Sequence, residues 1–281
     1  MKIRDLLSLV KIEHTLFALP LALIGTLMAA RGLPPFGVFF WVALAFTAAR
    51  TVAMAFNRIV DRRLDARNPR TADRDIPVGK ISLQRAAALT IVAAAVFFLS
   101  AWALNPLCLA LSPFALGLLA GYSYTKRFTV LSHYILGLCL GLAPVAGWIA
   151  VTGSFGWAPA VLGAGVVFWV GGFDILYACQ DVAFDRRTGL FSIPARFGEA
   201  RAMQIARLSH AAAYLFFVLS GLVASLGWCF FALSLVTAAL LYWEHRLVAP
   251  DNLTRLELAF FRVNSMVSLS LLLAVIGGLW C

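Results

Sequence analysis

Long apolar segments alternate with short polar ones along the whole chain. An α-helix needs about 20 apolar residues to cross a bilayer. Nine segments approach that length: residues 14–31, 36–56, 84–104, 106–121, 131–152, 158–180, 206–226, 228–243 and 260–280. The pattern predicts an all-α integral membrane protein with about nine transmembrane helices in one bundle. We expect residues 1–281 to form a single membrane-embedded domain.

The connections between these helices alternate in charge. Those near 31–36, 104–106, 152–158 and 225–228 are short and nearly uncharged, whereas 57–80, 122–130, 181–204 and 244–259 carry almost all the charge. Of the 23 Lys and Arg residues, all except Arg31 and Arg50 are assigned to one side, which the positive-inside rule makes cytoplasmic. After nine crossings Cys281 would lie outside. All 13 acidic residues fall on or near the same cytoplasmic side, which that rule does not require.

Composition supports the membrane assignment, because 62% hydrophobic residues, 13% charged residues and a mean hydropathy of +0.89 exclude an ordinary soluble domain. The net charge of +10 lies in the helix connections, so we read it as topology and expect no nucleic-acid ligand. The first apolar segment is expected to be a membrane helix and not a cleaved signal peptide. His14 beside Glu13 is expected to be an interfacial polar residue. The cysteines have no metal-binding spacing and are expected to be buried core residues: Cys108, Cys139, Cys179, Cys229 and Cys281.

A charged motif, N-x-x-x-D-x-x-x-D at Asn57, Asp61 and Asp65, directly follows the second apolar segment. On a helix, side chains four residues apart share one face, so these oxygens would form a row. Two neighbouring carboxylates repel one another, and a hard cation such as Mg²⁺ would compensate them. The alternative is a solvated helix end whose acids are neutralised by adjacent arginines.

A second acidic motif ends the sixth apolar segment. Asp181 and Asp185 repeat the four-residue spacing, and on a continuous helix Asp174 and Tyr177 would share their face. A carboxylate within the membrane, as expected for Asp174, usually marks a functional site. Four helices separate the two motifs, which suggests a parallel four-helix repeat that brings both motifs to one cavity mouth. So much negative charge predicts more than one cation with an anionic substrate between them.

A diphosphate would suit such cations, and nearby basic residues would complete its binding site. Candidates are Arg62, Arg74, Lys80 and the cluster Tyr122–Arg127, in which two tyrosines, Tyr122 and Tyr124, flank Lys126. Arg50 lies seven residues before Asn57, on the same helix face and deeper in the membrane. Its guanidinium could bind a carboxylate or phosphate, or pair with Asp174.

These motifs, with the nine-helix pattern, resemble the UbiA-type membrane prenyltransferase superfamily. The similarity is greatest to its 4-hydroxybenzoate polyprenyltransferase branch, through Lys11–Pro20 and Gly121–Thr129. The resemblance implies a helical bundle around a central cavity, a prenyl diphosphate donor, an aromatic acid acceptor and the lipid bilayer as surroundings, with no obligate protein partner. It also implies Mg²⁺ on Asn57, Asp61, Asp65, Asp181 and Asp185.

From this resemblance we expect prenyl transfer in quinone biosynthesis, by ionisation of the diphosphate and attack of the aromatic ring. Arg50 would hold the acceptor carboxylate, Lys126 would assist ionisation, and Asp174 or a nearby base would remove the ring proton. Further substrate-binding residues would be Asn57, Arg62, Tyr122, Tyr124, Arg127 and Tyr177. The site would face the cytoplasm from a bacterial inner membrane.

Two acceptors fit the resemblance, 4-hydroxybenzoate and the dihydroxynaphthoate of the futalosine route to menaquinone. A transporter is the alternative of another class, since intramembrane acids and repeats also mark ion pathways. It predicts charges near the bilayer midplane, whereas these lie at the cytoplasmic helix ends. CDP-alcohol phosphotransferases also use paired aspartates, but their D-G-x-x-A-R start is absent from the sequence.

Overall fold

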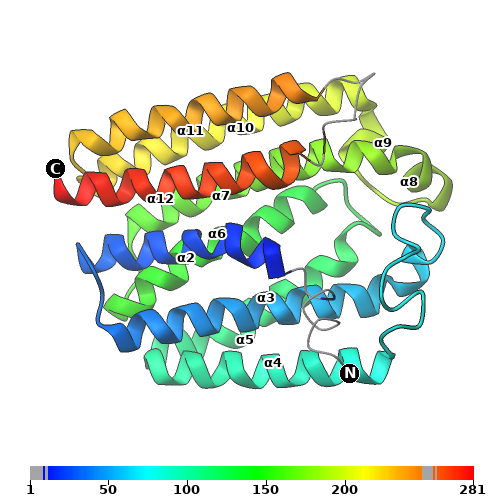
Figure 1. The fold of residues 1–281 in the computed structure, drawn as a ribbon, viewed down its shortest axis with the longest axis horizontal. Coiled ribbons are helices and arrows are strands. Elements are labelled where there is room, and N and C mark those ends of the chain that lie inside the picture. Colours follow the sequence, from blue (N-terminus) through cyan, green and yellow to red (C-terminus); the bar gives the residue numbers. More distant parts are fainter. Residues whose placement is uncertain (1–8, 10–11, 249–255, 257) are drawn as a thin grey trace.

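The computed structural model describes residues 9, 12–248, 256 and 258–281, and for residues 12–17 and 260 it describes the backbone only. The fold is a bundle of long helices running side by side (Figure 1), with no strand in the described ranges. The long helices are α2 (Ile12–Ala30), α3 (Phe36–Asp65), α4 (Leu83–Leu104), α5 (Pro106–Thr125), α6 (Ser132–Thr152), α7 (Trp157–Ala178), α10 (Glu199–Val223), α11 (Trp228–Leu247) and α12 (Asn264–Trp280).

The expected all-α membrane fold is confirmed. Eight helices are long and apolar enough to span a membrane by length and composition, and the apolar part of α2, Ala18–Ala30, is a shorter candidate. The count of nine crossings is therefore approximate. The side chain of His14 and the N-terminal residues before Leu9 lie outside the described part of the chain.

Several helix ends differ from the predicted ones. The change from apolar to polar residues marks where a helix leaves the membrane, and the helix itself continues beyond that point. The second helix runs to Asp65 and not to residue 56, so the first acidic motif is helical. The fourth and eighth helices extend to Thr125 and Leu247, and the seventh begins at Glu199 and not at 206. The last helix begins as a π-helical segment, Leu258–Val263.

The second acidic motif does not lie on one continuous helix, as the spacing argument assumed. α7 ends at Ala178 and is followed by a 3₁₀ turn, Cys179–Asp181, and then by the short helices α8 (Val182–Thr188) and α9 (Ile193–Phe197). These two short helices within the 181–204 connection were not predicted. The turn separates Asp181 from the helical face that carries Asp174, so tertiary structure and not helical period sets their relation.

The core lies around α7, which packs against α6 and α10, while α2 packs on α6, α3 on α4 and α11 on α12. Trp169 of α7 and Phe217 of α10 are fully buried there. α2 and α6 approach closely because position 25 is glycine: a Cβ at Gly25 would lie 1.9 Å from the Pro144 carbonyl oxygen.

The connections segregate to the two ends of the bundle (Figure 1). The α3–α4 connection, the α5–α6 connection and α8–α9 lie at one end, and the chain ends at Cys281 at the opposite end. At that opposite end Cys229 and Cys281 form a disulfide. The expectation of five buried core cysteines is therefore wrong for these two: Cys229 is partly buried, Cys281 is exposed, and helix packing brings together residues 52 positions apart. Cys139 and Cys179 are buried as expected, and Cys108 is partly buried.

Candidate active site

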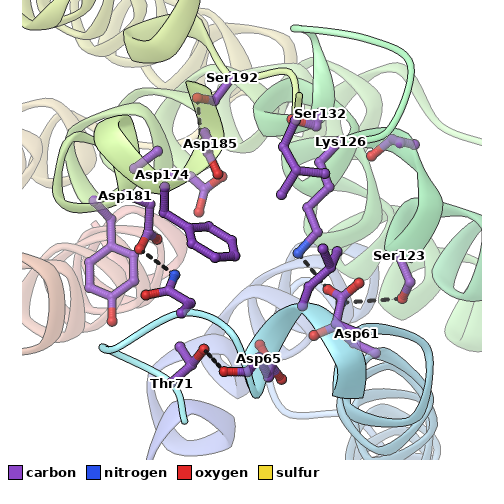
Figure 2. Close-up of a pocket in the computed structure, with 18 of the residues that line it drawn as sticks. Asp61, Asp65, Thr71, Ser123, Lys126, Ser132, Asp174, Asp181, Asp185 and Ser192 are labelled. Atoms are coloured by element: carbon purple, nitrogen blue, oxygen red, sulfur yellow. Dashed lines mark hydrogen bonds and ion pairs between the residues drawn. The ribbon is translucent and has the colours of Figure 1, made fainter. Parts of the chain in front are cut away.

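The two acidic motifs face each other across one cavity of about 190 Å³ at the charged end of the bundle. In Figure 2, Asp174, Asp181 and Asp185 lie on one side, and Asp61 and Asp65 on the other. The polar lining consists of Asn57, Asp61, Asp65, Asn68, Arg70, Thr71, Arg74, Tyr122, Ser123, Thr125, Lys126, Ser132, His133, Asp174, Tyr177, Asp181, Asp185 and Ser192. Residues as far apart as 57 and 192 therefore meet at one site.

Asp61 is the most enclosed carboxylate of the site, at 2% exposure, and two cations balance its charge. Lys126 Nζ lies 2.6 Å from its Oδ2, and Arg127 Nη2 lies 2.7 Å from its Oδ1. Asn57 Nδ2 donates to Oδ2 at 3.2 Å, as the four-residue helical spacing allows. This arrangement draws the α5–α6 connection onto α3.

Asp65, one helical turn further along α3, is held by the α3–α4 connection. Arg74 Nη1 lies 2.7 Å from Asp65 Oδ1, and Thr71 Oγ1 donates to the Asp65 carbonyl at 3.1 Å. Asp65 Oδ2 is buried and has no hydrogen-bond partner among the described residues. A buried carboxylate oxygen without a donor is costly, so this atom is suited to receive a ligand.

Asp181 is bound by residues from the same α3–α4 connection. Arg70 reaches it through Nε–Oδ1 at 3.0 Å and Nη2–Oδ2 at 2.5 Å, and Asn68 Nδ2 donates to Oδ1 at 2.8 Å. Arg70 Nη1 also donates to the Tyr177 hydroxyl at 3.0 Å. Burial disfavours the charged form of Arg70, but the hydrogen bond and negative charge of Asp181 outweigh it and raise the Arg70 pKa. The connection thus ties both acidic motifs together.

The remaining two carboxylates contact a histidine and a serine. Asp174 Oδ2 lies 2.7 Å from His133 Nδ1, and Asp185 Oδ2 accepts from Ser192 Oγ at 2.7 Å. The side chain of Asp174 is 23% exposed and lines the cavity. Each of these carboxylates is thereby fixed through one oxygen.

Some predicted residues lie away from the cavity lining. Arg62 donates to the Ile59 carbonyl at 2.9 Å, Tyr124 is 44% exposed, and Arg127 contacts the site through Asp61. Arg50 lies deeper in α3, outside the cavity lining. Lys80 pairs with Asp75 at 3.1 Å.

Sequence reasoning missed several lining residues, above all Arg70, Asn68 and His133. Arg70 and Asn68 lie directly after the first motif, in the run Asn-Pro-Arg, and that proximity was the available signal. His133 stands at the start of an apolar helix and has no motif partner nearby in sequence. Only the fold brings it next to Asp174.

Comparison with known proteins identifies the family. A sequence model of the UbiA prenyltransferase family matches residues 18–266. The chain belongs to the UbiA prenyltransferase family. As a UbiA-family member it is an enzyme of prenyl transfer embedded in a membrane, so the transporter alternative is set aside.

Two relatives of this UbiA-family chain carry the same type of name. A 4-hydroxybenzoate solanesyltransferase from Synechocystis is 30% identical over 92% of this chain and 88% of its own length. A 4-hydroxybenzoate octaprenyltransferase from Vibrio atlanticus is 29% identical over 90% of this chain and 89% of its own. The two names differ in the length of the prenyl chain and agree in the acceptor.

Solved structures of UbiA homologs share the fold. The apo structure of a homolog from Aeropyrum pernix K1 has a TM-score of 0.85 and 33% identity, covering 94% of this chain and 97% of that one. A homolog from Archaeoglobus fulgidus bound to DMAPP and Mg²⁺ has a TM-score of 0.70 and 20% identity, covering 97% of this chain and 99% of that one. At that identity the second likeness concerns the fold alone.

The residues of the cavity are chemically suited to a divalent cation. Carboxylate and amide oxygens from both motifs line it, and the orphaned Oδ2 of Asp65 offers a ligand atom without a competing donor. In the described ranges no three Asp, Glu, His or Cys side chains already stand in a metal-binding group. Asp61, Asp65 and Asp181 instead contact basic side chains, which would have to share them with a cation.

Proposed function

We propose that this UbiA-family enzyme transfers a polyprenyl chain from a prenyl diphosphate to 4-hydroxybenzoate in quinone biosynthesis. The observation that carries the proposal is the meeting of both acidic motifs across one cavity with Lys126 and Arg70 at its edge. The names of the two relatives support the acceptor. One membrane-embedded domain, residues 1–281, would perform the reaction.

The donor diphosphate would occupy the space between the motifs. Mg²⁺ would be held by Asn57, Asp61, Asp65, Asp181 and Asp185. When bound, it would neutralise the charge that the departing diphosphate develops. The Archaeoglobus fulgidus homolog of the same fold was solved with DMAPP and Mg²⁺ bound, and we infer the same metal here.

The basic residues would bind the diphosphate oxygens directly. Lys126 and Arg70 each pair with a carboxylate that we assign to the metal. When the metal binds these carboxylates, the two basic side chains would be free to turn toward the diphosphate. Their positive charge would favour breaking of the allylic C–O bond, in which the electron pair leaves with the diphosphate and an allylic cation remains. Five further residues would help to bind the substrate: Tyr122 and Tyr177 from the cavity lining, and Arg62, Tyr124 and Arg127 from its margin.

The acceptor would bind deeper in the cavity. Arg50 would hold its carboxylate, a role suited to a guanidinium that lies on the same helix as Asn57 and Asp61, deeper in the bundle. The ring carbon ortho to the hydroxyl would attack the allylic cation, and Asp174 would take the ring proton that this carbon loses. The apolar helices around the cavity would exclude water, which would otherwise capture the cation.

The cavity would face the cytoplasm, in a bacterial inner membrane. The charged connections at the cavity end support this orientation through the positive-inside rule. The Cys229–Cys281 disulfide supports it independently, since disulfides persist in oxidising compartments and this one lies at the opposite end. The exposed Arg187, replaced by cysteine, should react with a membrane-impermeant maleimide only after cells are permeabilised.

The deciding experiment uses membranes that contain the protein, radiolabelled prenyl diphosphate, Mg²⁺ and a panel of aromatic acids. Asp61→Ala and Asp181→Ala should each reduce prenyl transfer by about 100-fold or more, as expected when a preorganised electrostatic group is lost. Asp75→Asn is the matched control, since Asp75 pairs with Lys80 away from the cavity lining. Full activity in either alanine variant would refute the metal assignment, and product from a dihydroxynaphthoate alone would change the acceptor.

A further inference from the structure

Both ring nitrogens of His133 are engaged, each by a different part of the site. Nδ1 lies 2.7 Å from Asp174 Oδ2, and Nε2 lies 3.2 Å from the Ile193 backbone nitrogen. His133 is 4% exposed and lies in the first turn of α6. His133 therefore connects α6, α7 and the segment before α9.

The hydrogen-bond partners fix the protonation of this ring. A backbone N–H can only donate, so Nε2 must accept from Ile193 with its lone pair. The neutral ring then carries its proton on Nδ1, which donates to the Asp174 carboxylate. With both nitrogens occupied, His133 has no lone pair left to accept a proton from a substrate.

The contact with Ile193 satisfies a helix end. The first N–H groups of a helix have no partner within it. In α9 the Ile193 N–H is taken by His133, Pro194 has none, and the Ala195 N–H donates to Ser192 Oγ at 3.3 Å. His133 thus completes the cap of α9.

The same segment orients a carboxylate of the second acidic motif. Ser192 Oγ accepts from Ala195 and so directs its own hydrogen to Asp185 Oδ2, 2.7 Å away. Figure 2 shows Ser192 above Asp185 on the side of the cavity that carries Asp174. A further contact, from Phe191 N–H to the Lys126 carbonyl at 2.8 Å, anchors the segment to the α5–α6 connection.

We propose that His133 is a positioning residue that sets Asp174 through Nδ1–H and, through Nε2 and the Ser192–Ile193 segment, sets Asp185. This rests on the proposed function for the roles of Asp174 at the acceptor and Asp185 at the metal. One imidazole thereby couples the proposed proton acceptor, Asp174, to the proposed metal ligand Asp185 on the same side of the cavity. Its two bonds can be separated by substitution.

Two amide variants divide these contacts. In His133→Asn the side-chain amide lies where Nδ1 lay, so it keeps a donor to Asp174 and loses the acceptor for Ile193. In His133→Gln the longer amide reaches the position of Nε2, so it keeps the acceptor and loses the donor. Ser209→Ala is the control, because it removes a partly buried hydrogen bond between α10 and Tyr134, which follows His133 in α6 and lies outside the cavity lining.

The expected kinetics of the full-length protein in detergent differ between the two variants. His133→Asn should raise the Mg²⁺ concentration needed for half-maximal activity by about 10-fold, the lower range for loss of a group that orients a metal ligand, and leave kcat within about 3-fold. His133→Gln should lower kcat by about 10-fold or more and leave the Mg²⁺ requirement unchanged. Equal loss of both parameters in both variants would mean a merely structural role and would overturn the proposal.

Two measurements do not depend on activity. Hydrogen exchange of the peptide containing Ile193 should accelerate about 10-fold in His133→Asn, and remain at the wild-type rate in His133→Gln and Ser209→Ala. If neither variant folds, ¹⁵N spectra of the four histidines in the wild-type protein should show a neutral Nδ1–H ring for His133 at pH 7.5. A neutral Nε2–H ring, or unchanged exchange in His133→Asn, would overturn the proposal. If the wild-type protein forms no prenylated 4-hydroxybenzoate, the proposed function fails while these two readouts still decide the role of His133.

Discussion

We predict that the ion pair between Arg70 and Asp181 stabilises the folded protein by a measurable amount. It joins the α3–α4 connection to the end of α7 by two parallel hydrogen bonds, Nε–Oδ1 and Nη2–Oδ2. Hydrogen bonds to charged groups contribute about 1.5–3 kcal/mol each, which gives roughly 3–6 kcal/mol before solvation is considered. The Arg70 side chain is 29% exposed and that of Asp181 is 15% exposed, so water and conformational entropy offset part of this. We expect a coupling energy of about 2 kcal/mol.

A double-mutant cycle measures this coupling. Arg70→Met, Asp181→Asn and the double variant would be purified in detergent, and their thermal unfolding followed by tryptophan fluorescence. One kcal/mol corresponds to about 2–4 °C in Tm for a chain of this size. The sum of the Tm losses in the two single variants should therefore exceed the Tm loss in the double variant by about 4–8 °C. Arg187→Met controls for loss of an exposed arginine at the same end of the bundle. Losses that add within about 1 °C would refute the inference that these residues form a bidentate pair that stabilises the fold.

Three further predictions concern other parts of the chain. Gly25→Ala should destabilise the protein by at least about 1–3 kcal/mol, because the new Cβ would meet the Pro144 carbonyl. Gly37→Ala is the control: a Cβ there meets open space, so Tm should remain unchanged. Serine at both disulfide positions should lower stability by at most about 4 kcal/mol, from the chain entropy of a loop of 52 residues, and should abolish the Tm shift that a reductant causes in wild type. Arg50→Ala should raise the KM for the aromatic acid more than the KM for the prenyl diphosphate. A change confined to the donor would instead assign Arg50 to the diphosphate.

The sequence by itself determined the membrane-helical fold and the residues of the two acidic motifs. Apolar runs near the bilayer thickness leave few alternatives to helices, because backbone groups in lipid must bond within their own segment. Asn57, Asp61 and Asp65 could be grouped because a helix places every fourth residue on one face, and α3 is helical through all three. These are local properties, and they can be read from spacing and composition.

Only the tertiary structure decided how the motifs meet and what surrounds them. Asp181 follows a 3₁₀ turn, so the helical period does not describe its position relative to Asp174. The contacts of Arg70 with Asp181, of His133 with Asp174, and the Cys229–Cys281 disulfide join residues 111, 41 and 52 positions apart. Such contacts depend on how the helices pack. Close approaches such as that at Gly25 determine this packing, and it cannot be read from the periodicity of the sequence.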